Sequence, residues 1–118
     1  VKDDTFIKVA GKYAEGVYAA GPQDNSKNPL TKEANEAHKK AYGKDPGAFY
    51  ENAYSAALAI LNAIEQADST EYDAIAKALH ESEVATPVGT IKFDERGDAT
   101  GVGFSMYQVK DGKFVEAK

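Results

Sequence analysis

Residues 47–67, with the sequence GAFYENAYSAALAILNAIEQA, restrict the possible folds of this chain more than any other segment. Beyond Gly47 the segment contains no glycine or proline and is rich in alanine, leucine and isoleucine, so it predicts one long helix. Its apolar residues fall on two helical faces, with Phe49, Ala53, Ala56, Ala57, Ile60 and Ile64 on one and Tyr50, Tyr54, Leu58 and Leu61 on the other. Because such a helix is apolar nearly all round, we expect it to be buried on several sides as the core helix of its body.

Shorter helices are predicted over residues 3–13, 31–42 and 69–81. The first is expected to stop near Gly11. The second has acidic residues early and lysines late, with Gly43 directly after it, which is the charge order that complements a helix dipole. The third begins at Ser69 and Thr70, either of which can cap it, and Thr70 with Asp73 resembles a capping box.

Period-two alternation replaces the helical pattern near the C-terminus and predicts strands over residues 87–93, 101–109 and 113–116. A buried strand is also predicted over residues 15–22. Asp111-Gly112 is a strong signal for a two-residue hairpin, because both central positions of a type I′ turn need positive φ. The predicted fold class is α/β, with three to four helices, a strand near residue 17 and a C-terminal set of strands.

The composition excludes several classes of function. The net charge is −5 and the lysines are scattered, so we do not expect a nucleic-acid partner. Without cysteine the chain has neither disulfides nor thiolate nucleophiles, and only His38 and His80 remain as soft metal ligands, both of which we interpret as structural. Its apolar runs are too short to cross a bilayer, and a secretory signal would have been removed upstream.

Residues 94–98, DERGD, place three carboxylates around a glycine, as in a metal site, a pair of catalytic acids or a turn. The ligand spacing of an EF-hand calcium loop is not matched, and Arg96 would lie among the ligands. Two catalytic carboxylates would need an apolar pocket, which a loop between strands does not offer. We favour a turn in which Gly97 is left-handed and both Asp94 and Asp98 bond their own backbone. No catalytic residue, metal ligand or cofactor is predicted.

Phe49 and Tyr50 are the candidate ligand-binding residues. They start the long helix directly after KDPG, where side chains and free backbone amides can face a cleft. Packing of the two rings into a core is the alternative interpretation.

Three segments in order, AGKYAEGVYAAGP, KDPGAFYENAYSAALAILNAIEQA and VGTIKFDERGDATGVGFSMYQVKDGKFV, resemble the C-terminal third of leucine/isoleucine/valine-binding proteins. These are type I periplasmic substrate-binding proteins of ABC amino-acid transporters, and the resemblance covers essentially the whole chain. It implies a fold of two α/β lobes that close on a ligand by a hinge motion. Residues 1–118 would then be a C-terminal fragment, with residues 1–22 and 102–118 as pieces of the second lobe and residues 23–101 as a piece of the first.

The resemblance also implies a function. It indicates a non-enzymatic, extracytoplasmic solute-binding protein, without a cofactor, that captures branched-chain or similar amino acids for an ABC permease in the membrane. Of the family's ligand contacts only the apolar one at Phe49 carries over, with Tyr50 as a weaker neighbour. The alternative is a ligand-binding sensory domain of the same fold in a receptor or regulator.

Two expectations follow for the isolated fragment. The family's groups that bind the carboxylate and the ammonium of the amino acid lie before Val1, so the fragment should bind weakly or not at all. The core helix over residues 48–67 and the strand edges would be uncovered, which favours a homodimer formed by swapping or pairing.

Overall fold

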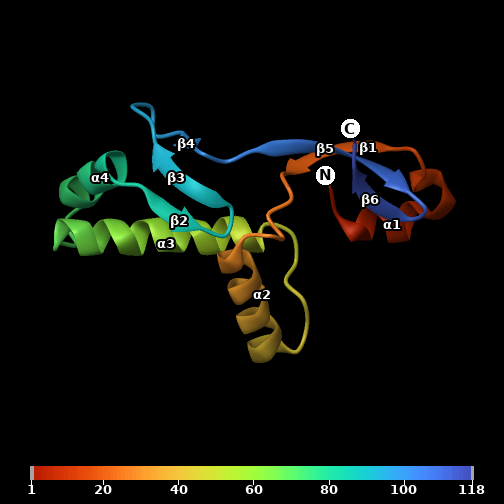
Figure 1. Cartoon of the computed structure of the whole chain (residues 1–118), viewed down its shortest axis with the longest axis horizontal. Helices are drawn as coiled ribbons and strands as arrows, with labels where there is room; N and C mark the ends of the chain where they lie inside the picture. The colour runs from red at the N-terminus through yellow and green to blue at the C-terminus, as the bar shows by residue number, and fades with distance from the viewer. Residues whose placement is uncertain (1, 118) are drawn as a thin grey trace. The chain divides into compact units, whose positions relative to one another are not determined.

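The computed structural model describes residues 2–117, which divide into two compact units. The first unit comprises the chain up to Asp24 together with the chain from Gly103 onward, and the second runs from Asn25 to Val102. The described part of the chain contains four α-helices and two separate three-stranded sheets (Figure 1). The predicted α/β fold class is therefore confirmed. Within residues 2–117, none of the helices combines the length and the apolarity that a membrane crossing requires.

In the first unit, helix α1 spans Asp4–Ala10 and a 3₁₀ helix follows over Gly11–Ala14. The Asp3 carboxylate caps α1 by accepting a hydrogen bond from the Thr5 amide at 2.6 Å. Hydrogen bonds from the side chain and the backbone amide of Thr5 lower the pKa of Asp3, because they stabilise the ionised carboxylate. Gly11 follows the last residue of α1, as the sequence predicted.

The sheet of the first unit is antiparallel and has the order β1-β5-β6. Its strands are β1, Tyr18–Pro22, β5, Phe104–Lys110, and β6, Lys113–Glu116. The predicted hairpin joins β5 to β6: Asp111 and Gly112 have φ values of 50° and 72°, and Lys110 pairs with Lys113. Positive φ at both central residues is the type I′ geometry, so this prediction is confirmed.

The two faces of this sheet differ in burial. Tyr107 and Val109 lie on one face and are buried. The opposite face is apolar but exposed, and by strand register it carries Tyr18, Phe104, Met106 and Val115. The strand predicted over residues 15–22 is present as β1, but its predicted burial is wrong. β1 is an edge strand of which only Gly21 is buried, because its outer face stays exposed within the described part of this unit.

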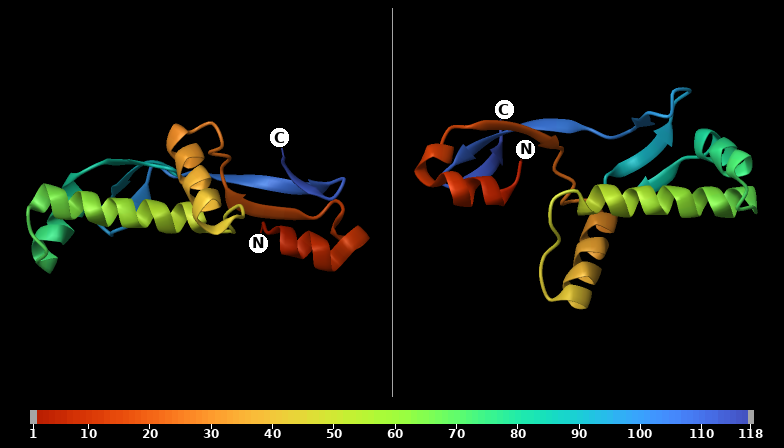
Figure 2. Two further views of the ribbon diagram at one scale, coloured as in Figure 1. Left: turned by 90° about the horizontal axis from the view of Figure 1, so that it is seen from below. Right: turned by 180° about the vertical axis from the view of Figure 1, so that it is seen from behind.

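The second unit contains three helices and the sheet β2-β3-β4. Its elements are α2, Pro29–Tyr42, α3, Tyr50–Ala67, α4, Tyr72–Glu81, β2, Val84–Thr86, β3, Gly89–Phe93, and β4, Ala99–Thr100. α4 and β2 pack against α3, the long green helix in both views of Figure 2. The core consists of Ala59, Val88 and Ile91, with half-buried apolar side chains around them.

Asn28 fixes the start of α2 and joins it to the turn between β2 and β3. Its side-chain oxygen accepts a hydrogen bond from the Leu30 amide at 3.0 Å, which caps the helix. Its Nδ2 donates to the Thr86 carbonyl at 2.9 Å, and the buried Thr31 hydroxyl donates to the Pro87 carbonyl at 2.7 Å. The helix predicted over residues 31–42 is confirmed, with an earlier start at the Asn28 cap.

α3 confirms the predicted long helix but not its predicted burial. Its buried residues are Ser55, Ala59 and Ala63, which form a single stripe at a spacing of four. Neither predicted apolar face is the buried one, since Ile60 is 50% exposed and Leu61 is 62% exposed. Within the described part of this unit, α4 and β2 approach one side of α3, where small side chains allow close contact.

Two local predictions in the second unit are wrong. No capping box forms before α4, because Glu71 occupies the cap position and makes no side-chain cap bond, while the Ser69 hydroxyl accepts from the Glu71 amide at 3.1 Å. The strand predicted from residue 87 begins at Gly89, since Pro87 lies in the turn that follows β2. The sequence did not predict β2 and β4, which are too short to show a clear alternation.

Candidate ligand-contact site

Phe49 presents an exposed aromatic ring at the start of α3. The residue is 66% exposed, so its ring is not part of the core of the second unit. Its backbone has a φ of 65° and a ψ of 1°, in the left-handed region. A left-handed backbone costs a residue with a Cβ atom roughly 1–2 kcal/mol, so the surroundings must hold Phe49 in this conformation.

The backbone around Phe49 starts α3 without help from a side-chain cap. The Phe49 carbonyl accepts the first helical hydrogen bond, from the Ala53 amide at 3.0 Å, and the Tyr50 amide donates to the Gly47 carbonyl at 3.4 Å. The first amides of a helix lack helical partners and carry partial positive charge. Phe49 therefore places an apolar ring beside an electropositive helix end, where Glu51 is the acidic residue of the first turn.

Tyr50, the other predicted site residue, has different surroundings from Phe49. Its hydroxyl donates to the Ala34 carbonyl of α2 at 3.0 Å. Its ring meets the His38 ring edge-on at 4.8 Å between centroids and lies 5.9 Å from the Tyr54 ring. Partial desolvation, with smaller contributions from Tyr54 and Tyr42, raises the pKa of Tyr50 above its usual value. Tyr50 is thus anchored to α2, while Phe49 is presented to solvent.

His38 is half-buried and contacts the loop that follows α2. Its Nδ1 donates to the Lys44 carbonyl at 3.0 Å, and its ring centroid lies 4.8 Å from that of Tyr42. The aromatic cluster of His38, Tyr42, Tyr50 and Tyr54 was not predicted from the sequence. The sequence did contain a signal for this cluster. His38 with Tyr42, and Tyr50 with Tyr54, have the i, i+4 spacing that places two side chains next to each other on a helix.

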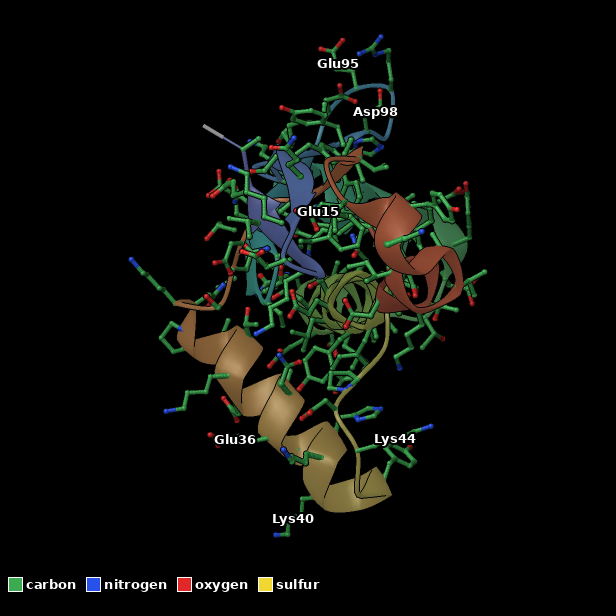
Figure 3. All side chains as sticks on the ribbon, turned by 90° about the vertical axis from the view of Figure 1, so that its right-hand side faces the viewer. Glu15, Glu36, Lys40, Lys44, Glu95 and Asp98 are labelled. Atoms are coloured by element: carbon green, nitrogen blue, oxygen red, sulfur yellow. The ribbon has the colours of Figure 1, made fainter. Side chains whose placement is uncertain are left out.

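The segment 94–98 forms the predicted turn, between β3 and β4. Gly97 has a φ of 83°, and the Asp94 carboxylate accepts hydrogen bonds from the Arg96 and Asp98 amides, each at 2.9 Å. The prediction for the Asp98 side chain is wrong, since it lies 3.5 Å from the Arg96 guanidinium instead of bonding its own backbone. Glu95 and Asp98 lie at the tip of this hairpin (Figure 3).

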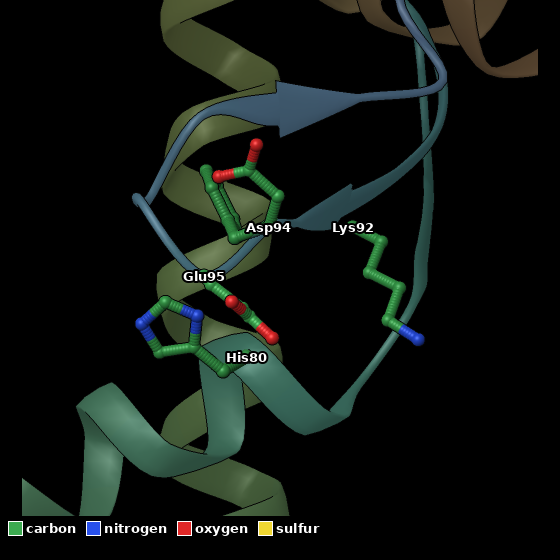
Figure 4. Close-up of a pocket in the computed structure, with 5 residues that line it drawn as sticks. His80, Lys92, Asp94 and Glu95 are labelled. Atoms are coloured by element: carbon green, nitrogen blue, oxygen red, sulfur yellow. The ribbon is translucent and has the colours of Figure 1, made fainter.

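An open cavity of about 490 Å³ lies between α4 and this hairpin and is lined by His80, Lys92, Phe93, Asp94 and Glu95. The Lys92 side chain extends away from His80 and Glu95 (Figure 4). Among residues 2–117, no three His, Cys, Asp or Glu side chains are grouped so that they could hold a metal ion. The cavity was not predicted from the sequence, and it contains neither Phe49 nor Tyr50.

Comparison with known proteins gives consistent matches over nearly the whole chain. Residues 1–113 match the family model described as periplasmic binding protein. The chain is 38% identical over 112 residues to the Leu/Ile/Val-binding protein homolog 3 of Brucella melitensis biotype 1, a match that covers 93% of this chain and 30% of that protein.

Two solved structures are also similar. The first is a leucine binding protein, LivK, from Thermotoga maritima MSB8, with a TM-score of 0.81 and 29% identity over 98% of this chain and 34% of that chain. The second is an ABC transporter substrate-binding protein from Desulfitobacterium hafniense, with a TM-score of 0.78 and 27% identity over 92% of this chain and 33% of that chain. The chain therefore spans about a third of the length of the proteins that it matches.

Proposed function

The chain belongs to the periplasmic binding protein family, and we propose that it is the C-terminal part of an extracytoplasmic protein that captures branched-chain or similar amino acids for an ABC importer. The family confirms the resemblance seen in the sequence, and the relatives are named as binding proteins rather than enzymes. The names of the Brucella and Thermotoga proteins support the ligand class. The name of the Desulfitobacterium protein supports delivery to a membrane permease.

The observation that carries the proposal is the exposed, left-handed Phe49 at the start of α3. An apolar ring that is held outside the core suits contact with an aliphatic side chain, because burying each methylene group of a ligand contributes about 0.8 kcal/mol. In this proposal Phe49 is the ligand-contacting residue. Tyr50 is its weaker neighbour, whose hydroxyl is already occupied by Ala34.

The two lobes of the proposed parent protein correspond to the two units of the chain. Residues 1–22 and 102–118 contribute to the second lobe and residues 23–101 to the first. The division of the structure near Asp24 and near Val102 supports these boundaries. Each lobe would then be completed by chain that is not part of the 118 residues.

The isolated chain is proposed to bind its ligand weakly or not at all. Phe49 offers an apolar contact only, whereas capture of a zwitterion needs charge-assisted hydrogen bonds to both its carboxylate and its ammonium. Of the neighbouring charged groups, Glu51 lies 3.3 Å from Asn35 and is engaged in that contact.

A homodimer of the isolated chain is also proposed. Its support is the apolar surface that the described units leave exposed, which includes Ile60 and Leu61 on α3 and Phe104 and Met106 on β5. A chain that exposes such surfaces gains free energy when a second copy covers them.

Calorimetric titration with leucine, isoleucine and valine tests the proposed function. The full-length parent should release or absorb heat on binding at least one of these amino acids. The 118-residue chain should give little heat of binding with any of them. In the parent, Phe49→Ala should weaken binding by about tenfold, as expected for losing about 1.4 kcal/mol of contact energy. Absence of binding by the parent to any aliphatic amino acid would overturn the proposed ligand class.

A further inference from the structure

Phe49 lies between two short segments that are both tied to one face of α2. On its N-terminal side, His38 Nδ1 donates to the Lys44 carbonyl at 3.0 Å. On its C-terminal side, the Tyr50 hydroxyl donates to the Ala34 carbonyl at 3.0 Å. Ala34 and His38 are four residues apart on α2 and therefore lie on the same helical face. One face of α2 thus contacts the backbone of Lys44, before Phe49, and the side chain of Tyr50, directly after it.

The rings of His38 and Tyr50 also contact each other. The His38 and Tyr50 centroids are 4.8 Å apart with an interplanar angle of 70°, an edge-to-face arrangement. Both residues are half-buried. A third tie to the same loop, from Lys39 Nζ to the Asp45 carboxylate at 3.2 Å, joins side chains that are 64% and 80% exposed. Exposed ion pairs contribute little, so His38 and Tyr50 carry most of the restraint.

The loop has little other regular structure with which to hold Phe49. Between the end of α2 at Tyr42 and the start of α3 at Tyr50 no helix or strand is formed, and both views of Figure 2 show this segment returning from the end of α2 to the start of α3. Lys44 extends from the loop near the end of α2 (Figure 3). A residue that disfavours left-handed φ relaxes when its restraints are lost, and relaxation at Phe49 would redirect its ring.

We propose that His38 and Tyr50 are positioning residues that together hold Phe49 in its left-handed conformation and so aim its ring toward the ligand. The proposal rests on the proposed ligand contact of Phe49. His38 acts through an Nδ1–H group, because the Lys44 carbonyl can only accept.

NMR spectroscopy of the 118-residue chain tests the positioning role without a ligand. A left-handed residue has a short distance between its own amide and Hα protons, so wild-type Phe49 should show a strong intraresidue cross-peak. Tyr50→Phe keeps the ring and removes the hydroxyl, and His38→Gln moves the donor to the Nε2 position. Each should shift the ratio of left-handed to other backbone states at Phe49 by about fivefold, as expected for losing one net hydrogen bond.

Two control variants make the result specific. His38→Asn places an amide donor close to the Nδ1 position and should restore the Phe49 cross-peak, whereas Lys39→Ala should leave it unchanged because it removes only the exposed ion pair. Amide signals of Ala59 and Ala63 report whether α3 is folded in each variant. If one variant loses α3, the conclusion rests on the other.

An unchanged Phe49 cross-peak in folded His38→Gln and Tyr50→Phe would overturn the proposal. Titration of the same variants in the full-length parent separates it from the proposed function. If the Phe49 conformation changes but affinity for aliphatic amino acids does not, the positioning role stands and the ligand contact of Phe49 fails. If both the Phe49 conformation and the affinity change, the positioning role and the ligand contact of Phe49 are both supported.

Discussion

The hydroxyl of Tyr107 donates a hydrogen bond to the carbonyl of Pro22, at a sequence separation of 85. The bond links β5 to the end of β1 within the first unit. Tyr107 is only 5% exposed, and Lys2 Nζ lies 4.5 Å from its ring centroid. Pairing of β1 with β5 already brings the two strands together. The hydrogen bond from Tyr107 additionally restrains Pro22, the last residue of β1.

Replacement of Tyr107 by phenylalanine should destabilise the first unit by about 1 kcal/mol, because the ring stays and one hydrogen bond is lost. Urea denaturation of the chain measures the effect. Tyr18→Phe is the matched control, since Tyr18 is 60% exposed and should change stability by less than about 0.5 kcal/mol. Equal effects of the two variants would show that the Tyr107 hydroxyl contributes nothing.

The stability of the first unit should fall at alkaline pH, partly through Tyr107. Burial, with smaller contributions from the carboxylates of Glu116 and Asp24, raises the pKa of Tyr107 above its usual value. Because the folded-state pKa is the higher one, this contribution is present below the unfolded value of about 10 and is lost as pH rises through the folded-state value. Denaturation curves at several pH values should show a smaller alkaline loss for Tyr107→Phe than for wild type.

The backbone of Phe49 predicts an unusual order of stability. Phe49→Gly should be more stable than Phe49→Ala by about 1 kcal/mol, because both remove the exposed ring and glycine alone adopts the left-handed region freely. In an ordinary helical position alanine is the more stabilising residue. Thermal or urea unfolding of the two variants gives the comparison, and a more stable Phe49→Ala would contradict the left-handed conformation.

The turn between β3 and β4 should depend on Asp94 and tolerate changes at Asp98. Asp94→Ala removes a carboxylate that accepts two backbone hydrogen bonds and should cost about 1–2 kcal/mol. Asp98→Ala removes a side chain that pairs with an exposed Arg96 and should change stability by less than about 0.5 kcal/mol. Chemical denaturation measures both, and a larger loss for Asp98→Ala would reverse the assigned roles.

Light scattering of the isolated chain should give the mass of a dimer. Ile60→Asp puts a charge on the exposed apolar face of α3 and should shift the chain toward the monomer. Gln66→Asp introduces the same charge at another exposed position of α3 and should not. A compact, stable monomer of the unmodified chain would remove the homodimer from the proposed function.

Local signals in the sequence predicted the hairpins well. The turn at Asp111 and Gly112 and the turn around Gly97 depend on residues that tolerate positive φ, and such preferences act within a few residues. The long helix α3 was predictable for the same reason, since alanine and leucine favour a helix without distant contacts.

Burial was predicted less well, because it depends on which elements lie against each face. α3 buries Ser55, Ala59 and Ala63, whereas its apolar pattern pointed to Ile60 and Leu61. In the same way β1 lies at a sheet edge, although its apolar run indicated a buried strand. The hydrophobicity of a residue indicates how much free energy its burial would contribute, but it does not indicate which element of the fold packs against it.

The sequence by itself determined the family, the helices and hairpins, and the position of Phe49 at the start of a helix, because these follow from motifs and short-range backbone preferences. Tertiary structure alone decided that Phe49 is left-handed and exposed and that His38 and Tyr50 tie its flanks to α2. Those features depend on hydrogen bonds between separate elements. Their donors and acceptors become neighbours only after the chain has folded.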